Sequence, residues 1–496
     1  MRKNLRRMLA SLALCAVLAG TLTVSASAAA FRDVPTGHWA EKEIQRCVEN
    51  GFFNGQSETH FGLGQKMSRS AFAVVLCRFF GWETGTAAET TFSDVPADAW
   101  YAGAVEAAVQ HGAIINPSGE FRPNDPITRE ELAVMLVRAL GYDDIAGLAQ
   151  DLPMPFTDVT TSPGYITMAY DLGLVNGTTA TTFAPNNTAT REQVAVILMR
   201  LYDKLHGAQP ETMGVVSEAV DLTGLDVAAI PAVRLFSFGM KAAMDDETVA
   251  AIQSAASETG GKAFLYLTAG ATVLGKAPEE ICTMMVDAVK AGGYDGLVLE
   301  IPDMTNKKAA ALNELAAQLN RALGELPFWL VAEAPGRSGA VHGGYQYETL
   351  GACVDRLLLK IPAVEEGNRS FTVAPIDPPE ELYSALAKTK TLVGSDKVAL
   401  MLESGMKRWS NGSAASLSKD ELNALLADEN TNVYYSDRYE CAYLLSGDVQ
   451  GKPDTVWYLT EGDVASRVRL AQSFGIGWIC VSDWDAATGE FLAGLE

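Results

Sequence analysis

The chain has 496 residues, enough for more than one domain, and a formal net charge of −23. So acidic a protein disfavours nucleic acid and anionic lipid as partners, because both are negatively charged themselves. Its five histidines are scattered without metal-ligand spacing, so we predict neither a metal site nor a cofactor.

The first thirty residues have the pattern of an export signal. A basic start at residues 2–7 precedes a short apolar run at 9–22 and small residues at 25–30. The apolar run is too short for a typical membrane span. We therefore expect a cleaved signal peptide over residues 1–30, a secreted product and no membrane span after cleavage.

One pattern then occurs three times between Phe31 and Leu201. Each copy begins with Phe-x-Asp-Val, continues as an amphipathic helix and a glycine turn, and opens a second helix at an arginine. A period of roughly 60 residues predicts an array of small helical units that share one core. We expect repeats at residues 31–90, 91–154 and 155–203, with helix-opening arginines at Arg69, Arg129 and Arg191.

The second helix of each repeat has a recognisable start. Thr128 is followed three residues later by Glu131, which is the spacing of a capping box. The third repeat has Thr190 and Gln193 in the same places, whereas the first has Ser68 and no glutamate.

The helix-opening arginines admit two interpretations. A cation at the positive end of a helix dipole is unfavourable unless it meets an anion. A guanidinium beside free helix-terminal N–H groups would bind a carboxylate on a sugar, with Trp39, Trp100 and Tyr165 as an aromatic platform. Alternatively, each arginine pairs with the aspartate that starts the next repeat, and the aromatic residues belong to the core.

The repeats resemble the S-layer homology (SLH) module over about residues 31–203. In that family a Thr-Arg-Ala-Glu motif lies between pseudo-symmetric repeats and binds pyruvylated secondary cell-wall polysaccharide. The resemblance implies a wall-anchored protein. It also implies polymer binding at Arg129 and Arg191, whose motifs match well, and at Arg69, whose motif is weak.

Two smaller expectations concern the cysteines and the linker. Cys47 and Cys77 fall on the two helices of the first repeat and could pair, but small buried thiols are favoured for all six cysteines after the signal. Residues 204–212 are polar, with Gly207 and Pro210, and are expected to form a linker.

Residues 213–496 alternate short apolar runs with longer amphipathic ones, which is typical of a parallel sheet covered by helices. About eight strands favour a TIM-type (βα)8 barrel, so the fold class is an all-α repeat array followed by an α/β barrel. A doubly wound open sheet is the alternative, without a glycine-rich loop to support it. The expected strands are residues 213–219, 233–238, 263–268, 296–301, 329–334, 356–361, 398–402 and 477–482.

Carboxylates follow several of these strands, where barrel chemistry is located. Glu300, Glu333 and Glu403 are the candidate catalytic residues, because paired carboxylates suit glycoside hydrolysis. Solvated loop acids in an acidic protein are the plainer interpretation. Trp484 and Trp409, with Trp478, are candidate platforms for sugars.

The barrel region resembles glycoside hydrolase family 18 over about residues 213–490. Residues 293–302 are similar to its strand-four signature, Asp-Gly-x-Asp-x-Asp-x-Glu, and residues 433–458 would hold its small α+β insertion. When the two are matched, Val298 stands at the position of the family's first inner acid and Glu300 at that of the second. Pro302 stands at the position of the acid that donates the proton. The family's sixth-strand Met-x-Tyr-Asp pattern is replaced here by Lys360-Ile-Pro-Ala363.

These departures favour a non-catalytic barrel that binds peptidoglycan or another glycan, since a positioned acid supplies two to four decades of rate, roughly. The alternative is an active cell-wall glycosidase that uses relocated carboxylates, such as Glu300 with Glu333 or Glu403.

Overall fold

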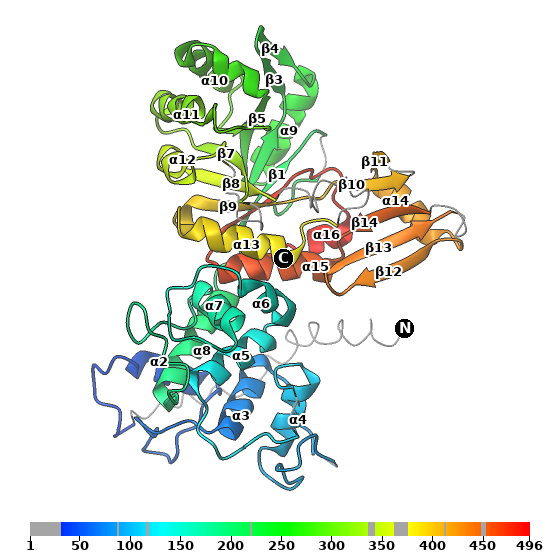
Figure 1. Cartoon of the computed structure of the whole chain (residues 1–496). Coiled ribbons are helices and arrows are strands. Elements are labelled where there is room, and N and C mark those ends of the chain that lie inside the picture. Colours follow the sequence, from blue (N-terminus) through cyan, green and yellow to red (C-terminus); the bar gives the residue numbers. More distant parts are fainter. Residues whose placement is uncertain are drawn as a thin grey trace.

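The structure is a computed structural model and describes residues 31–86, 89–115, 119–218, 221–335, 343–361, 375–410, 413–447 and 453–496. The expected signal peptide lies outside these residues. A helical array occupies one end of the molecule and a barrel the other (Figure 1). Within the described residues, no helix combines the length and the apolar character needed to cross a bilayer.

In the described residues the array contains three helix pairs, arranged in a ring, and one additional short helix. The first helix of each repeat packs against the second helix of the preceding repeat, and the first repeat packs against the third. Each unit therefore completes the core of its neighbour, as the sequence period predicted. The helices are α2 (Glu41–Glu49), α3 (Arg69–Phe80), α4 (Ala102–Gln110), α5 (Arg129–Ala139), α6 (Asp143–Ala149), α7 (Pro163–Asp171) and α8 (Arg191–Leu205). The additional short helix is α6, which packs on α7.

A closed cycle of three backbone hydrogen bonds joins the repeats just before α3, α5 and α8. Met67 N–H donates to the Ala189 carbonyl (2.9 Å), Ala189 N–H to Ile127 (3.0 Å), and Ile127 N–H to Met67 (2.8 Å). The N-termini of these three helices therefore meet around one pseudo-threefold axis.

Eight parallel strands close into the barrel, because the last strand pairs with the first. Alternate side chains fill its interior, among them Phe264, Val298, Trp329 and Met401. In order around the barrel the strands are β1 (Glu211–Val215), β2 (Val227–Ile230), β5 (Lys262–Ala269), β6 (Gly296–Glu300), β7 (Phe328–Glu333), β8 (Arg356–Lys360), β9 (Val398–Leu402) and β15 (Trp478–Val481).

One expected strand was wrong. The second barrel strand is β2, a four-residue run that is buried throughout. The segment expected in its place forms β3 (Val233–Phe236), which makes a hairpin with β4 (Gly239–Ala242) and pairs only with the end of β5. Both runs are short and apolar, and pattern alone does not tell a barrel strand from a hairpin beside it.

Helices cover the outside of the barrel, and Figure 1 shows two of them, α13 and α15, between the barrel and the array. The covering helices are α9 (Asp246–Glu258), α10 (Pro278–Ala291), α11 (Ala309–Leu323), α12 (Tyr347–Cys353), α13 (Pro379–Lys390), α15 (Glu461–Ser473) and the C-terminal α16 (Gly489–Ala493).

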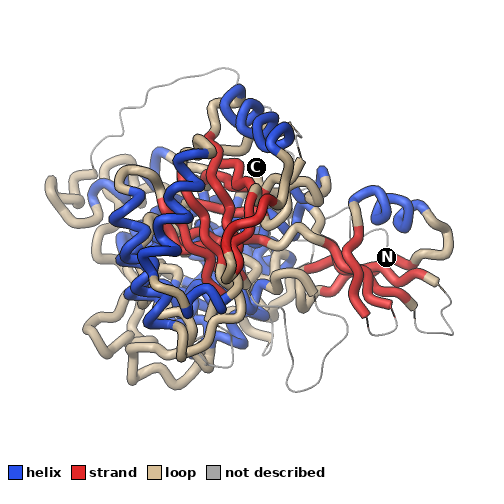
Figure 2. Tube along the Cα trace, turned by 90° about the horizontal axis from the view of Figure 1, so that it is seen from above, coloured by secondary structure: helices blue, strands red, loops and turns tan. Residues whose placement is uncertain are grey.

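An α+β insertion follows β9. It begins at Met406 rather than at residue 433 as expected, because its first two strands were not recognised. Figure 2 shows it to one side of the barrel, with α14 over one sheet face. The insertion comprises β10 (Met406–Ser410), β11 (Ser413–Leu417), α14 (Lys419–Ala427), β12 (Asn432–Ser436), β13 (Cys441–Ser446) and β14 (Asp454–Tyr458).

The array and the barrel are packed against each other. The Tyr383 hydroxyl of α13 donates to the Asp171 carboxylate at the end of α7 (2.9 Å), and Lys204 of α8 donates to the Ser473 carbonyl (2.6 Å). Tyr383 is only 1% exposed. Helix α8 continues to Leu205 and β1 begins at Glu211, so few residues separate the two parts.

The cysteines behave as buried thiols, which was the favoured interpretation. Cys47 donates to the Ala195 carbonyl and Cys77 to the Ala104 carbonyl, so the two do not pair. All six cysteines of the described chain are free, and only Cys353 is not fully buried.

Candidate functional sites at the repeat junctions and the barrel mouth

Each helix-opening arginine reaches into the next repeat of the ring. Its guanidinium carbon lies over a phenylalanine ring of that repeat, and its Nε–H donates to the carbonyl of the same phenylalanine. We call these contacts the Arg69, Arg129 and Arg191 junctions. The pairs are Arg69 with Phe121 (2.7 Å, 4.8 Å to the ring), Arg129 with Phe183 (2.9 Å, 4.5 Å) and Arg191 with Phe61 (2.9 Å, 4.9 Å).

The repeat-starting aspartates do not pair with these arginines. Asp158 accepts hydrogen bonds from the backbone N–H groups of Phe183 (2.8 Å) and Ala184 (2.7 Å). These bonds lower the pKa of Asp158. Asp33 and Asp94 close the loops of their own repeats in the same way. The alternative that each arginine forms an ion pair with the next aspartate is therefore wrong.

The backbone amide at the first position of α3, α5 and α8 is not free, contrary to expectation, but hydrogen-bonded. The backbone N–H of Arg69 donates to Asp125 (3.0 Å), that of Arg129 to Asn187 (2.9 Å) and that of Arg191 to Gln65 (2.9 Å). These carbonyls come from the neighbouring repeat. Any anion that binds at a junction must therefore be recognised by the side-chain guanidinium rather than by this amide.

Two junctions leave one guanidinium nitrogen open. Arg129 Nη2 donates to the Asn176 carbonyl (2.6 Å), and Arg191 Nη2 donates to the Asn54 carbonyl (2.8 Å). Within the described chain, Nη1 of neither arginine has a hydrogen-bond partner. Burial lowers the pKa of both side chains, so each is a half-buried cation that an anion would stabilise.

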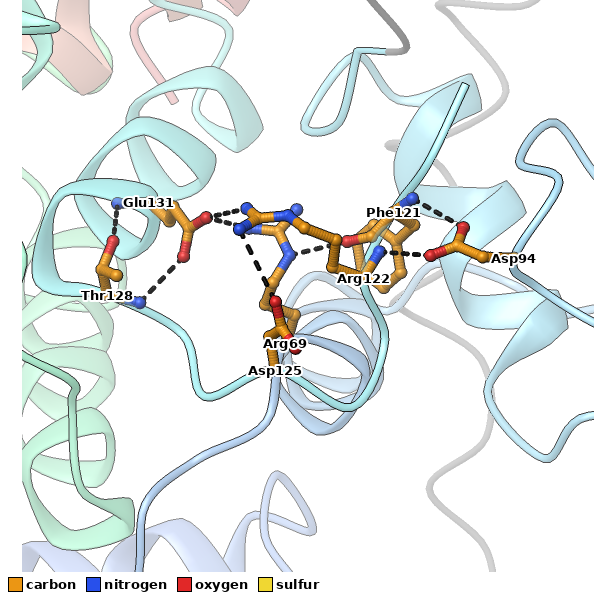
Figure 3. A network of polar contacts seen from close by, with 7 residues as sticks. All are labelled: Arg69, Asp94, Phe121, Arg122, Asp125, Thr128 and Glu131. Carbon is orange, nitrogen blue, oxygen red and sulfur yellow. Dashed lines mark hydrogen bonds and ion pairs between the residues drawn. The ribbon is translucent and has the colours of Figure 1, made fainter. Parts of the chain in front are cut away.

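The Arg69 junction differs, as Figure 3 shows. Arg69 Nη1 forms an ion pair with Glu131 (2.9 Å), and the same carboxylate also pairs with Arg122. Glu131 additionally accepts the Thr128 N–H (2.9 Å), completing the capping box of α5. Only 12% of the Arg69 side chain is exposed.

The aromatic residues at the start of each first helix fall into two groups. Trp39 is 59% exposed and Trp100 is 70% exposed, so neither belongs to the core. Tyr165 is half-buried, because its hydroxyl bonds to Asp143 and the guanidinium of Arg138 lies over its ring.

The barrel mouth collects the three predicted carboxylates around one lysine. Glu300 accepts hydrogen bonds from the Tyr266 hydroxyl (2.8 Å) and from Lys360 Nζ (3.0 Å). Burial alone would lower the pKa of Lys360, but the charges of Glu300, Glu403 and Glu333 raise it.

The other two carboxyl residues have different surroundings. Glu403 Oε1 accepts bonds from the Ser482 hydroxyl (2.8 Å) and the Gly405 N–H (2.9 Å). Glu333 ends β7, and its backbone carbonyl accepts the Tyr347 hydroxyl (2.6 Å).

Strand alternation points Val298 and Glu300 into the barrel, as predicted. Val298 is fully buried in the interior cluster, and Glu300 contacts Tyr266 of the same cluster. Pro302 follows the end of β6 and has no ionisable group.

Two of the three candidate tryptophan platforms, Trp484 and Trp478, are buried. Trp484 is 7% exposed, and its indole N–H donates to the Asp221 carbonyl (3.3 Å). Its ring lies so close to Gly214 that a side chain there would collide with it. Trp478 packs edge-on against Trp329 inside the barrel (4.7 Å). Trp409 is half-buried in strand β10 of the insertion sheet.

Sequence reasoning missed a buried polar pair beside Glu403. Asp377 accepts the Glu403 N–H (2.5 Å), and burial raises its pKa to about 7. Arg467 is completely buried and donates to backbone carbonyls of three segments, including those of Asp377, Glu440 and Asp463. The only sequence signal was an aspartate before two prolines, which is typical of many turns.

The comparisons with known proteins separate the two parts of the chain. The S-layer homology domain matches residues 30–73, 91–133 and 155–195. An amylopullulanase of Thermoanaerobacterium thermosulfurigenes is 30% identical over 180 residues, 35% of this chain and 10% of that protein. A surface-layer 125 kDa protein of Lysinibacillus sphaericus is 29% identical over 231 residues, 45% of this chain and 19% of that protein. The chain thus spans less than a fifth of either relative.

Among solved structures, a chitinase of Chromobacterium violaceum is similar with a TM-score of 0.50 and 15% identity, over 58% of this chain and 98% of that one. The spore cortex-lytic enzyme SleL of Bacillus cereus has a TM-score of 0.51 and 14% identity, over 58% and 74%. At such identities the similarity establishes the TIM-type fold and no more.

Proposed function

We propose that the three S-layer homology repeats of this chain bind an acidic wall polysaccharide through Arg129 and Arg191, and so anchor the protein to the cell wall. The repeats and the surface-layer relative indicate a secreted protein of the bacterial cell surface. The proposed anchor spans residues 31–203 and the displayed barrel residues 213–496.

The observation that carries this proposal is the open Nη1 of Arg129 and Arg191. Each guanidinium is fixed by its Nε and Nη2 bonds and by the phenylalanine ring beneath it. A pre-oriented, half-buried guanidinium binds a carboxylate well, since little freedom is lost on binding. The carboxylate of a pyruvate ketal on a wall sugar fits this requirement.

Sedimentation with purified wall sacculi tests the anchor. We expect the double variant Arg129→Ala, Arg191→Ala to lose binding by about tenfold or more for each arginine removed. Arg200→Ala, an exposed change on α8, removes a charge from the same array and should still sediment. Sacculi stripped of pyruvate should fail to bind the unchanged protein. If the double variant still bound sacculi, the proposed role of these two arginines in binding would be wrong.

For the barrel, we propose a non-catalytic domain that binds a glycan such as peptidoglycan. Three features support it: Pro302 at the position of the family acid, Val298 at an inner acid position, and the ion pair that holds Glu300. Both carboxylate oxygens of Glu300 already accept hydrogen bonds, one from the Tyr266 hydroxyl and one from Lys360 Nζ, so neither is free to act on a glycosidic oxygen.

The second candidate is an active cell-wall glycosidase, favoured by Glu333 and Glu403 at the same mouth. Release of reducing ends from peptidoglycan and chitin oligosaccharides decides between the two. We expect no turnover by the unchanged protein. Turnover that disappears in Glu300→Gln or Glu403→Gln would establish the glycosidase instead.

A further inference from the structure

The Arg69 junction already contains a carboxylate. Glu131 accepts from Arg69 and Arg122 and is 22% exposed in its side chain. It lies where the open nitrogens of the other junctions would receive a ligand, on the Nη1 of the helix-opening arginine. An incoming anion would have to displace this carboxylate, together with its bond to the cap of α5.

The other two junctions lack this arrangement at equivalent positions. Three residues into α8, next to the Arg129 junction, stands Gln193, and three residues into α3, next to the Arg191 junction, stands Ala71. The position of Arg122, directly after the ring phenylalanine, is Ala184 in the third repeat and Gly62 in the first. None of these four residues is charged.

We propose that Glu131 acts as an internal ligand that closes the Arg69 junction, so that the array takes an acidic sugar at two of its three junctions. This inference rests on the proposed anchoring function. It also explains how a helix-opening arginine can be retained without serving as a polymer site: Arg69 holds the second repeat through Phe121 and Glu131.

The test is a calorimetric titration with a hexosamine that carries a pyruvate ketal. We expect two ligands per chain for the unchanged protein and three for Glu131→Gln. The glutamine preserves the helix cap, since Gln193 accepts the Thr190 N–H (3.1 Å) in the same motif. In the reciprocal change Gln193→Glu, a carboxylate enters the Arg129 junction, and we expect one ligand per chain.

Two controls separate an opened junction from a mere change in charge. The double variant Glu131→Gln, Arg69→Ala should return to two ligands, because the third site needs the freed guanidinium. Arg69→Ala alone should keep two ligands with affinity within about twofold of the unchanged protein.

The possible outcomes assign failure to one proposal or the other. No binding by the unchanged protein, or binding that survives loss of Arg129 and Arg191, would overturn the anchoring function itself. Three ligands on the unchanged protein, with one lost in Arg69→Ala, would leave anchoring intact and overturn the closed junction. Two ligands on Glu131→Gln would overturn it as well.

Discussion

The repeat junctions and the barrel mouth both bring charged side chains together, but they treat them in opposite ways. At the Arg129 and Arg191 junctions a cation is held by carbonyls and a ring, and one nitrogen is left open. At the barrel mouth the cation Lys360 is paired with Glu300. A charge kept open suits ligand binding, whereas a paired charge suits structure. Our functional proposal therefore rests on the charges that lack internal partners.

The largest expected effect comes from removing a fully paired cation. Arg467→Ala would remove the buried side-chain donor that the backbone carbonyls of Asp377, Glu440 and Asp463 share. We expect the free energy of unfolding to fall by about 3 kcal/mol or more, measured by urea denaturation. Arg469→Ala, two residues along α15 and exposed, should change it by less than about 0.5 kcal/mol. Equal effects of the two changes would contradict the assigned role of Arg467.

The contact between array and barrel has an intermediate, pH-dependent effect. Burial raises the pKa of Asp171 from 3.8 to about 6, although Tyr383 donates to it. A carboxyl whose pKa is higher in the folded state stabilises the fold at low pH, and this stability is lost as pH rises through about 6. We therefore expect the array packed on the barrel to be more resistant to denaturant at pH 5 than at pH 7.

Asp171→Asn serves as the matched control for that pH dependence. The amide cannot ionise, so the difference between pH 5 and pH 7 should shrink. Tyr383→Phe should cost about 1–2 kcal/mol, because it leaves the Asp171 carboxyl without its hydroxyl donor. A pH profile that is unchanged in Asp171→Asn would assign the dependence to another group.

The same contrast explains how much could be foreseen from the sequence. The array was predictable because its motifs make contacts between residues that are close in the sequence. For example, Thr128 and Glu131 cap the helix that they begin. The barrel fold was also predictable, since its strands are continuous apolar runs. The partners of the arginines were not, because Phe121, Phe183 and Phe61 come from a different repeat than the arginine they hold.

At the barrel mouth the missing information was long-range as well. Tyr266, Glu300 and Lys360 come from three strands, β5, β6 and β8, and only the order of the strands in the folded sheet brings them into contact. Trp484 was misjudged because the sequence does not show that Gly214 leaves room for its ring. The presence of a tryptophan alone does not tell whether its ring is exposed to bind a sugar or buried in the core.

The smallest expected effect on stability, and the sharpest contrast with Arg467, belongs to Trp100. Because 70% of its surface is exposed, Trp100→Ala should change the free energy of unfolding by less than about 0.5 kcal/mol. If its ring forms a platform for the wall polymer, binding to sacculi should still fall about 3- to 10-fold, which corresponds to the stacking of one sugar on an aromatic face. Trp39→Ala should act in the same way, whereas Trp478→Ala in the barrel interior should destabilise the fold and leave wall binding by the folded fraction unchanged. A loss of stability without a loss of binding in Trp100→Ala would place that ring with the core, and the platform would have to be sought elsewhere.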